Sequence, residues 1–210
     1  MTGASPSILL LIPAYNEELR IGPVLETYAL YFREHHPDNF HLVVVLNGCT
    51  DDTLGVVERA SEQYPEISHV NIPEPIGKGG ALIEGLKLAP KADLLGYVDA
   101  DGATPPAAFD DLVTECAEAD CVIGSRWMAG SVLRQEQTFR RQFVSRVFHA
   151  IVQAFFWMNI RDTQCGAKVM HREAVEAIHG QLTVADMAFD INLLYALKRS
   201  GYTVREVPTE

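Results

Sequence analysis

The sequence has no long apolar run. Its N-terminal segment "ILLLIP", residues 8–13, is too short for the core of a signal peptide, and no basic residue precedes it. No stretch reaches the roughly 18 consecutive apolar residues that a membrane-spanning helix needs. We therefore expect no signal peptide and no transmembrane segment.

Cysteine is scarce and is not arranged for metal binding. The chain has four cysteines, none in a CxxC pair, and its seven histidines show no metal-ligand spacing. Secreted disulfide scaffolds and zinc sites depend on such spacing. We expect reduced thiols, a cytoplasmic protein, and neither a disulfide framework nor structural zinc.

Basic residues are few, with 17 Lys and Arg against 28 Asp and Glu, giving a net charge of −11. Because nucleic-acid phosphates would be repelled, we expect no nucleic-acid partner. The charge is uneven: residues 1–120 carry 6 basic and 20 acidic residues, whereas residues 121–210 carry 11 and 8. The segment 121–149 contains one acid and five arginines: Arg126, Arg134, Arg140, Arg141 and Arg146. The cluster is either an anion-binding surface or a solvated helix face.

Short apolar runs alternate with amphipathic patterns through the first 125 residues. Strands are predicted at 7–16, 40–48, 69–73, 94–100 and 120–125, and helices at 18–35, 49–64, 77–89 and 106–119. Alternation of this kind, with continuously apolar strands, is typical of an α/β fold in which helices cover both faces of a mostly parallel sheet. Ligands of such sheets bind at the carboxyl ends of the strands.

The alternation becomes irregular after Ser125. A long helix is predicted at 139–158, a strand at 165–171, a helix at 187–200 and a last strand at 202–208. We expect one domain over residues 1–210. The chain stops two residues after the last strand, without a cap or tail, which is consistent with a C-terminal truncation.

Two carboxylates, Asp99 and Asp101, follow the buried run "LLGYV". On an extended chain, residues at i and i+2 share one face, and two unneutralised carboxylates there would repel each other. A hard divalent cation, Mg²⁺ or Mn²⁺, resolves the repulsion and commonly uses one or two carboxylates together with phosphate and water. The alternative is a solvated turn.

Other polar residues fall at the same predicted edge: Tyr15, Glu17, Asn47 and Lys78. Lys78 lies in "GKGGA", a glycine turn that opens a helix, where backbone N–H groups and an ammonium can meet an anion. A tight turn with a surface lysine is the simpler interpretation. The stretch is neither a Walker A loop nor a GxGxxG fingerprint, so kinase and dehydrogenase functions are disfavoured.

Seven motifs occur in order along the chain: "IPAYNEE", "LNGCTDDT", "GKGGA", "DADGATP", "GSR", "RDTQCGAK" and "AFDINLL". Together they resemble glycosyltransferase family 2, and most of all its dolichyl-phosphate and polyprenyl-phosphate glucosyltransferases. The resemblance implies the GT-A fold, a Rossmann-like nucleotide-diphospho-sugar transferase fold. It also implies a nucleotide-sugar and metal half at about 1–125 and an acceptor half at about 126–210.

The resemblance also implies the donor contacts. Pro13, Tyr15 and Glu17 match the segment that holds uridine, and Asp51 matches an acid after the second strand. Asn47 stands where relatives carry an acid, which weakens the comparison at the base.

The remaining donor contacts implied are Lys78, Asp99 and Asp101, of which Asp99 and Asp101 match the metal-binding DxD motif. Ala103 replaces a glutamine that serves some mannosyltransferase relatives as a further metal ligand.

On the acceptor side, Arg126 matches an arginine that meets the acceptor phosphate, with Arg141, and Arg140 beside it, as the second. Arginine suits phosphate because its planar fork donates two hydrogen bonds. Asp190 lies where many family members keep a base for hydroxyl acceptors. A phosphate acceptor needs no base, so we expect Asp190 to orient the sugar or the acceptor, or else to be a helix surface acid or a capping acid near Asp186. The predicted catalytic residues are Asp101, Asp190, Arg126 and Arg141.

The expected activity is therefore inverting transfer of a hexose, glucose above all, from a UDP-sugar to a polyprenyl or dolichyl phosphate. Mg²⁺ or Mn²⁺ would be the cofactor. The aromatic helix predicted within 139–158 would lie at the lipid interface, which makes the protein peripheral at the cytoplasmic membrane face; a buried core helix is the alternative. Three other functions stay open: transfer to a hydroxyl with Asp190 as base, nucleotidyl transfer, and nucleotide-sugar binding without catalysis.

Overall fold

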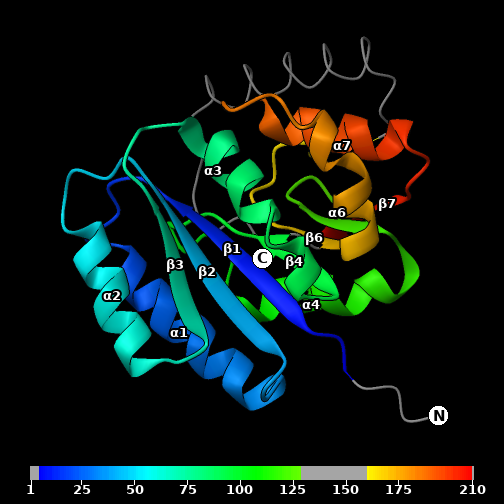
Figure 1. The fold of residues 1–210 in the computed structure, drawn as a ribbon. Helices are drawn as coiled ribbons and strands as arrows, with labels where there is room; N and C mark the ends of the chain where they lie inside the picture. Colours follow the sequence, from blue (N-terminus) through cyan, green and yellow to red (C-terminus); the bar gives the residue numbers. More distant parts are fainter. Residues whose placement is uncertain (1–4, 129–159, 210) are drawn as a thin grey trace.

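The structure is a computed structural model that describes residues 5–128 and 160–209. Within these residues the chain forms a seven-stranded sheet with the order β3-β2-β1-β4-β6-β5-β7 (Figure 1). The strands are β1 (Ile8–Ala14), β2 (Phe40–Asn47), β3 (Ile67–Ile72), β4 (Leu94–Tyr97), β5 (Cys121–Ser125), β6 (Lys168–His171) and β7 (Val204–Pro208).

The sheet is mostly parallel. Strands β3, β2, β1 and β4 pair in parallel, as do β5 and β7, whereas β6 is antiparallel to both of its neighbours, β4 and β5. The α/β class predicted from the alternating pattern is confirmed. The reversed strand β6 was not predicted, because strand direction depends on the path of the chain between β5 and β6 rather than on local sequence.

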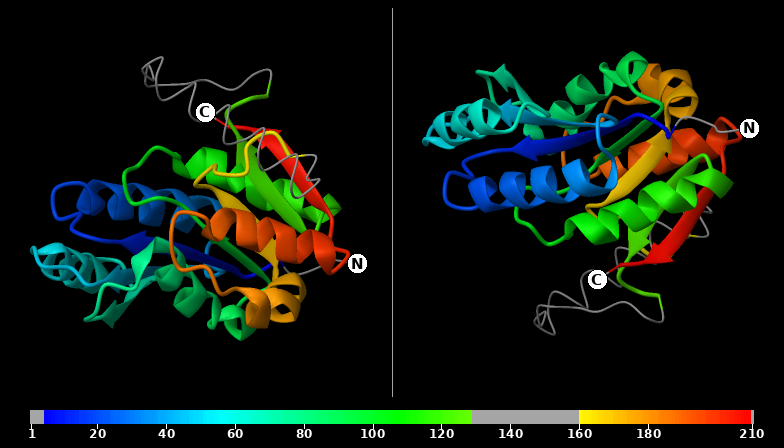
Figure 2. Two further views of the ribbon diagram at one scale, coloured as in Figure 1. Left: turned by 90° about the horizontal axis from the view of Figure 1, so that it is seen from above. Right: turned by 90° about the horizontal axis from the view of Figure 1, so that it is seen from below.

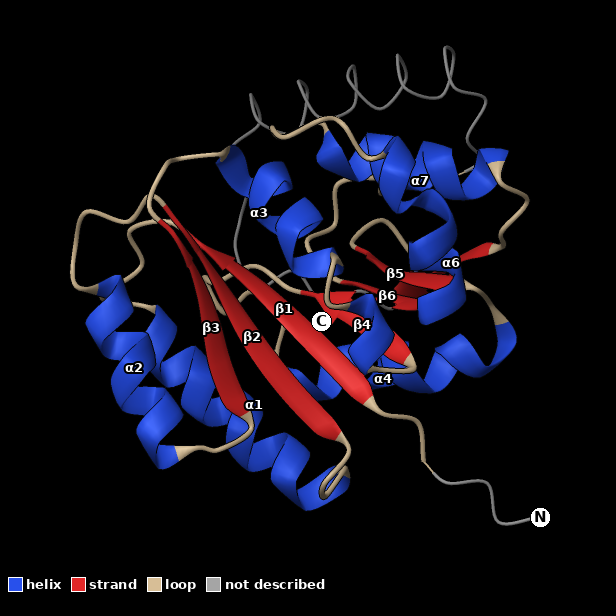
Figure 3. Ribbon diagram, viewed as in Figure 1, coloured by secondary structure: helices blue, strands red, loops and turns tan. Residues whose placement is uncertain are grey.

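Helices cover both faces of the sheet (Figures 2 and 3). One face packs on α1 (Ile21–His35), α2 (Thr53–Gln63) and α4 (Pro106–Glu115), the other on α3 (Gly77–Leu86), α6 (Arg172–Ile178) and α7 (Phe189–Arg199). Alternate residues of β1 divide between the two cores: Leu10 and Ile12 join the first, Leu9 and Leu11 the second. This two-sided burial explains why the strands are continuously apolar.

Several elements are shorter than predicted, and for two of them, β4 and β6, the difference bears on the site. Strand β4 ends at Tyr97, so Asp99 and Asp101 lie in the following loop rather than on extended chain. The strand predicted at 165–171 begins only at Lys168, because residues 161–167 form a loop, in which Gly166 lies against Asp99. The long helix predicted at 139–158 lies outside the described residues.

The carboxyl ends of β1, β2 and β3 meet at one edge of the sheet, where α3 also begins (upper left in Figure 1). Parallel pairing forces this arrangement, since each strand runs the same way. The polar loops that follow β1 and β2 are thereby brought together. Among the described residues, no helix is both long and apolar enough to cross a bilayer.

Phe32 on α1 anchors the first core. It is fully buried and stacks on Phe40 of β2 with ring centroids 4.1 Å apart. Phe32→Ala should lower the free energy of unfolding by about 3–5 kcal/mol, because it removes an aromatic ring and leaves a cavity. Urea denaturation measures the change. The matched control is Leu30→Ala on the same helix, where the side chain is 51% exposed and a change within about 0.5 kcal/mol is expected. Equal losses in the two variants would contradict this assignment of the core.

Candidate active site

The loops after β1 and β2 are tied together by side chains. Asn16 adopts a left-handed conformation with φ of 54°, and its Oδ1 accepts a hydrogen bond from the Thr50 backbone N–H at 2.8 Å. The Thr53 hydroxyl accepts one from the Glu17 N–H at 2.8 Å. Asparagine tolerates this backbone region better than most residues do, which explains its use here.

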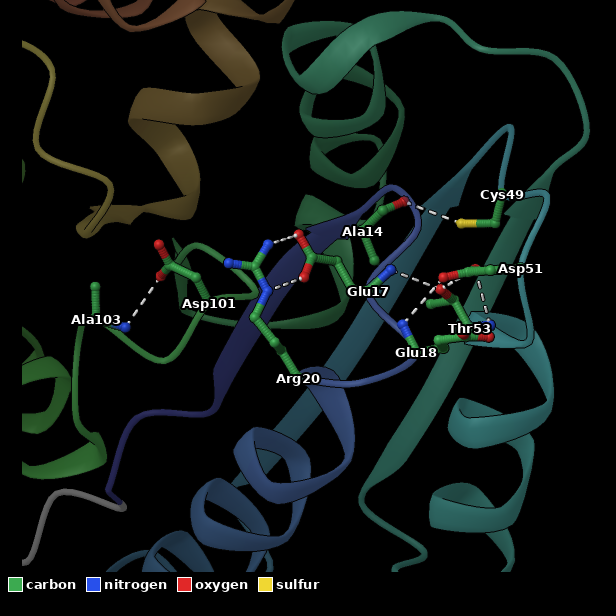
Figure 4. Close-up of polar contacts among 9 residues, drawn as sticks. All are labelled: Ala14, Glu17, Glu18, Arg20, Cys49, Asp51, Thr53, Asp101 and Ala103. Carbon is green, nitrogen blue, oxygen red and sulfur yellow. Dashed lines mark hydrogen bonds and ion pairs between the residues drawn. The ribbon is translucent and has the colours of Figure 1, made fainter.

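Asp51 also links the loops that follow β1 and β2 (Figure 4). Its Oδ1 accepts hydrogen bonds from the Thr53 hydroxyl and N–H at 2.5 and 3.1 Å, and its Oδ2 accepts the Glu18 N–H at 3.2 Å. Burial alone would raise the pKa of Asp51, but these hydrogen bonds to the carboxylate outweigh it and lower the pKa. Asp51 therefore shapes the loops at the predicted nucleotide site.

The other predicted donor contacts differ in their availability. The Tyr15 side chain is 54% exposed, and Pro13 is half-buried at the end of β1. The Nε and Nη2 atoms of Arg20 donate hydrogen bonds to the two carboxylate oxygens of Glu17, each at 2.7 Å (Figure 4). Asn47 is buried and accepts the Ile76 N–H at 2.6 Å, so it holds the loop before α3. Tyr15 is the most accessible of the four.

Lys78, the second residue of α3, reaches Asp99. Its Nζ lies 2.5 Å from Asp99 Oδ1. Burial alone would lower the pKa of Lys78, but the charges of Asp99, Asp190 and Asp101 and a hydrogen bond to Asp99 together raise it. Of the two DxD carboxylates, Asp99 is therefore in direct contact with Lys78.

Asp101 lies in the turn after Asp99 and is exposed. Its Oδ1 accepts the Ala103 N–H at 3.0 Å (Figure 4). Among residues 5–128 and 160–209, no group of three or more His, Cys, Asp or Glu residues gathers that could hold a metal. Two partly exposed carboxylates nevertheless fit Mg²⁺ or Mn²⁺, whose shells are commonly completed by phosphate oxygens and water. Ala103 contributes only its backbone N–H to this turn.

Arg126 follows β5 and is already paired. Its Nε and Nη2 donate to the two carboxylate oxygens of Asp162, at 2.7 and 2.9 Å. Asp162 is buried, and its own N–H donates to Glu206 on β7 at 2.9 Å. The hydrogen bond from Arg126 to Asp162 raises the arginine pKa.

The partner of Arg126 was not predicted from the sequence. Arg140 and Arg141, the other predicted phosphate contacts, lie outside the described residues.

Asp190 is buried in a charged cluster. Its Oδ1 accepts the Tyr97 hydroxyl at 2.5 Å and the Lys168 ammonium at 2.6 Å, and its side chain is only 8% exposed. Lys168 is fully buried and also donates to the Cys165 carbonyl at 2.6 Å. Burial raises the pKa of Tyr97 well above its usual value, and the charge of Asp190 adds to the effect. The alternative that Asp190 is a surface acid is wrong.

Lys168 and Tyr97 were missed by sequence reasoning. One signal was present: Lys168 interrupts an otherwise apolar strand pattern, "KVM", just after the "DTQCG" motif. A lysine in a buried strand needs a carboxylate partner.

A sequence model described as glycosyl transferase family 2 matches residues 9–178. The chain belongs to this family. The match covers most of the chain and includes β1 to β6, all of the donor-side residues described above, and Arg126. It confirms the family that the seven motifs indicated, and it argues against the nucleotidyltransferase alternative.

Two curated relatives illustrate the family likeness. The chain is 31% identical to the glycosyltransferase AglD of Haloferax volcanii, over 100% of this chain and 34% of that protein. It is 32% identical to a dolichyl-phosphate beta-glucosyltransferase of Trichomonas vaginalis, over 95% of this chain and 62% of that protein. The chain thus spans about a third and three fifths of these two relatives.

Two solved structures share the fold of this chain. A Pyrobaculum calidifontis mannosyltransferase in complex with GDP-Man and Mn²⁺ superposes with a TM-score of 0.71, at 22% identity, over 98% of this chain and 55% of that one. Glucosyl-3-phosphoglycerate synthase from Mycobacterium tuberculosis, in complex with Mg²⁺ and UDP, gives 0.71 at 19% identity, over 97% and 69%. The GT-A-like fold expected for the family 2 chain is confirmed.

Gly166 leaves no room for a side chain beside Asp99. A Cβ added there would overlap Asp99 Oδ2. Because the overlap is with the end of a rotatable side chain, Gly166→Ala should displace the Asp99 carboxylate and leave the fold intact. We expect about a 10- to 100-fold loss of Mn²⁺ affinity in the presence of UDP. Calorimetric titration measures the affinity, and circular dichroism checks the fold. Gly180→Ala, where nothing lies within 4 Å, is the control; an equal loss there would contradict the steric argument.

The buried Lys168–Asp190 pair should show strong coupling. Lys168→Met leaves the Asp190 carboxylate buried without its cation and should cost about 3–5 kcal/mol of unfolding free energy. Adding Asp190→Asn removes the uncompensated charge, so the double variant should be more stable than Lys168→Met alone. Guanidinium denaturation of both single variants and the double variant closes the cycle. Additive losses would show that the two residues do not act as a pair.

Proposed function

We propose that this chain transfers glucose from UDP-glucose to a polyprenyl or dolichyl phosphate, with inversion at the anomeric carbon. The observation that carries the proposal is the grouping of Asp99, Asp101 and Lys78 at the carboxyl edge of the sheet, where α/β folds bind nucleotides. Curated relatives named dolichyl-phosphate beta-glucosyltransferases from Trichomonas, Dictyostelium and Drosophila support the acceptor and the sugar.

On the donor side, Asp99 and Asp101 would hold Mg²⁺ or Mn²⁺. When bound, this ion neutralises the negative charge that develops on the leaving diphosphate. Two structures with the same fold were solved with such ions, which supports the proposal. Lys78 would donate to a diphosphate oxygen, and the exposed ring of Tyr15 would pack against the base. Pro13, Glu17, Asn47 and Asp51 would shape the nucleotide pocket, mainly through the loops that they hold.

On the acceptor side, a phosphate is already ionised near neutral pH and attacks without a general base. The environment of Asp190 is consistent with this, because its buried Oδ1 already accepts two hydrogen bonds from protein groups. A base must reach the acceptor hydroxyl. Asp190 would instead fix the position of groups around the sugar. Arg126, with Arg140 and Arg141, would bind the acceptor phosphate, and the protein would work at the cytoplasmic membrane face.

The proposal is tested by incubating the chain with radiolabelled UDP-glucose, Mn²⁺ and polyprenyl phosphate, followed by extraction into organic solvent. Label should enter the organic phase, and Asp101→Asn should reduce the rate at least about 100-fold because it removes a carboxylate ligand. The control is Asp38→Asn in the α1–β2 connection, where asparagine suits the positive φ of 66° and no change is expected.

Label that stays in the aqueous phase would overturn the lipid acceptor for this donor. Parallel reactions with GDP-mannose and UDP-galactose test the sugar. Asp190→Asn separates the two acceptor classes: a loss of several orders of magnitude with a hydroxyl acceptor would support the general-base alternative.

A further inference from the structure

The ion pair between Lys78 and Asp99 blocks one side of a carboxylate that the donor site needs. Lys78 Nζ lies 2.5 Å from Asp99 Oδ1, and the two side chains are 27% and 40% exposed. The other oxygen, Oδ2, faces Gly166 so closely that even a Cβ would overlap it. Both oxygens of Asp99 therefore have close protein neighbours.

Lys78 is held in this position by its backbone. Gly77, with φ of +77°, lies against the carbonyl of Ala185, which also accepts the Gly80 N–H at 3.0 Å. Gly79 packs against Phe189 at the start of α7. The first turn of α3 is thus packed against the segment before α7, so a movement of the Lys78 ammonium would come from rotation of its side chain.

The Lys78 ammonium contacts the Asp99 carboxylate at 2.5 Å. Asp190 itself accepts its hydrogen bonds from Lys168 and Tyr97 rather than from Lys78. Asp99 is therefore the direct carboxylate partner of the Lys78 ammonium.

We propose that the Lys78 ammonium pairs with the Asp99 carboxylate before the donor binds and moves to a diphosphate oxygen when the donor binds. The divalent cation and the nucleoside diphosphate then bind cooperatively. An ammonium and a divalent cation on one carboxylate oxygen repel each other strongly at such distances. A diphosphate removes this conflict, because it offers Lys78 another anion and gives the cation further oxygen ligands. The inference rests on the donor half of the proposed function and does not depend on the acceptor.

The experiment measures Mn²⁺ binding by electron paramagnetic resonance, with and without UDP. Lys78→Met keeps the length of the side chain but removes its charge, so Mn²⁺ alone should bind about tenfold more tightly or better than to the unmodified protein. The factor by which UDP tightens Mn²⁺ binding should fall, and linkage requires the same fall in the effect of Mn²⁺ on UDP. Lys78→Arg retains the charge and should keep the weak binding of Mn²⁺ alone.

Lys87→Met is the matched control. Lys87 lies directly after the same helix and pairs with Glu84 at 2.6 Å, with a side chain that is 54% exposed. Its removal also raises the net negative charge by one unit, but at a distance from Asp99, so Mn²⁺ affinity should change less than about twofold.

Three outcomes are distinguishable. Unchanged Mn²⁺ affinity in Lys78→Met, with UDP-dependent binding intact, overturns the inference and leaves the proposed function standing. Equal tightening in Lys78→Met and Lys87→Met shows a general charge effect and also overturns it. Absence of Mn²⁺ binding to the unmodified protein with saturating UDP contradicts the metal-dependent donor site itself.

Discussion

The Asp99 carboxylate is the point at which three segments of the candidate active site come into contact. It follows β4, contacts Lys78 at the start of α3, and lies against Gly166 in the loop before β6. A partly buried carboxylate is costly without a cation, so the position of α3 and that of the 161–167 loop are constrained together. Strand β4 lies between parallel β1 and antiparallel β6, and this central position brings Asp99 next to both α3 and the loop before β6.

Charged side chains around this point occur as pairs at different depths. Lys78 and Asp99 are both partly exposed, Arg126 is partly exposed but pairs with the buried Asp162, and Lys168 and Asp190 are both buried. The buried pair leaves no uncompensated charge beneath the site. In a chain of net charge −11, each of these three cations thus has a carboxylate partner within the fold.

The family assignment and the geometry support different parts of the functional proposal. Membership of glycosyl transferase family 2 and the fold fix the architecture. The contacts of Lys78, Asp99 and Asp101 support a donor site for a nucleotide-sugar and cation. The acceptor rests on named relatives, which this chain matches over only part of their length, and on Arg126, since Arg140 and Arg141 lie outside the described residues.

The sequence by itself determined the α/β class, the strands such as 40–48 and 120–125, and the grouping of Lys78 with Asp99, because continuous apolar runs and strand-end motifs are local signals. Only the tertiary structure decided the partners of those groups. Arg126 pairs with a residue 36 positions away and Lys168 with one 22 away. The direction of β6 and the close approach of Gly166 to Asp99 have the same origin. These features depend on how distant segments pack, and no local pattern specifies that packing.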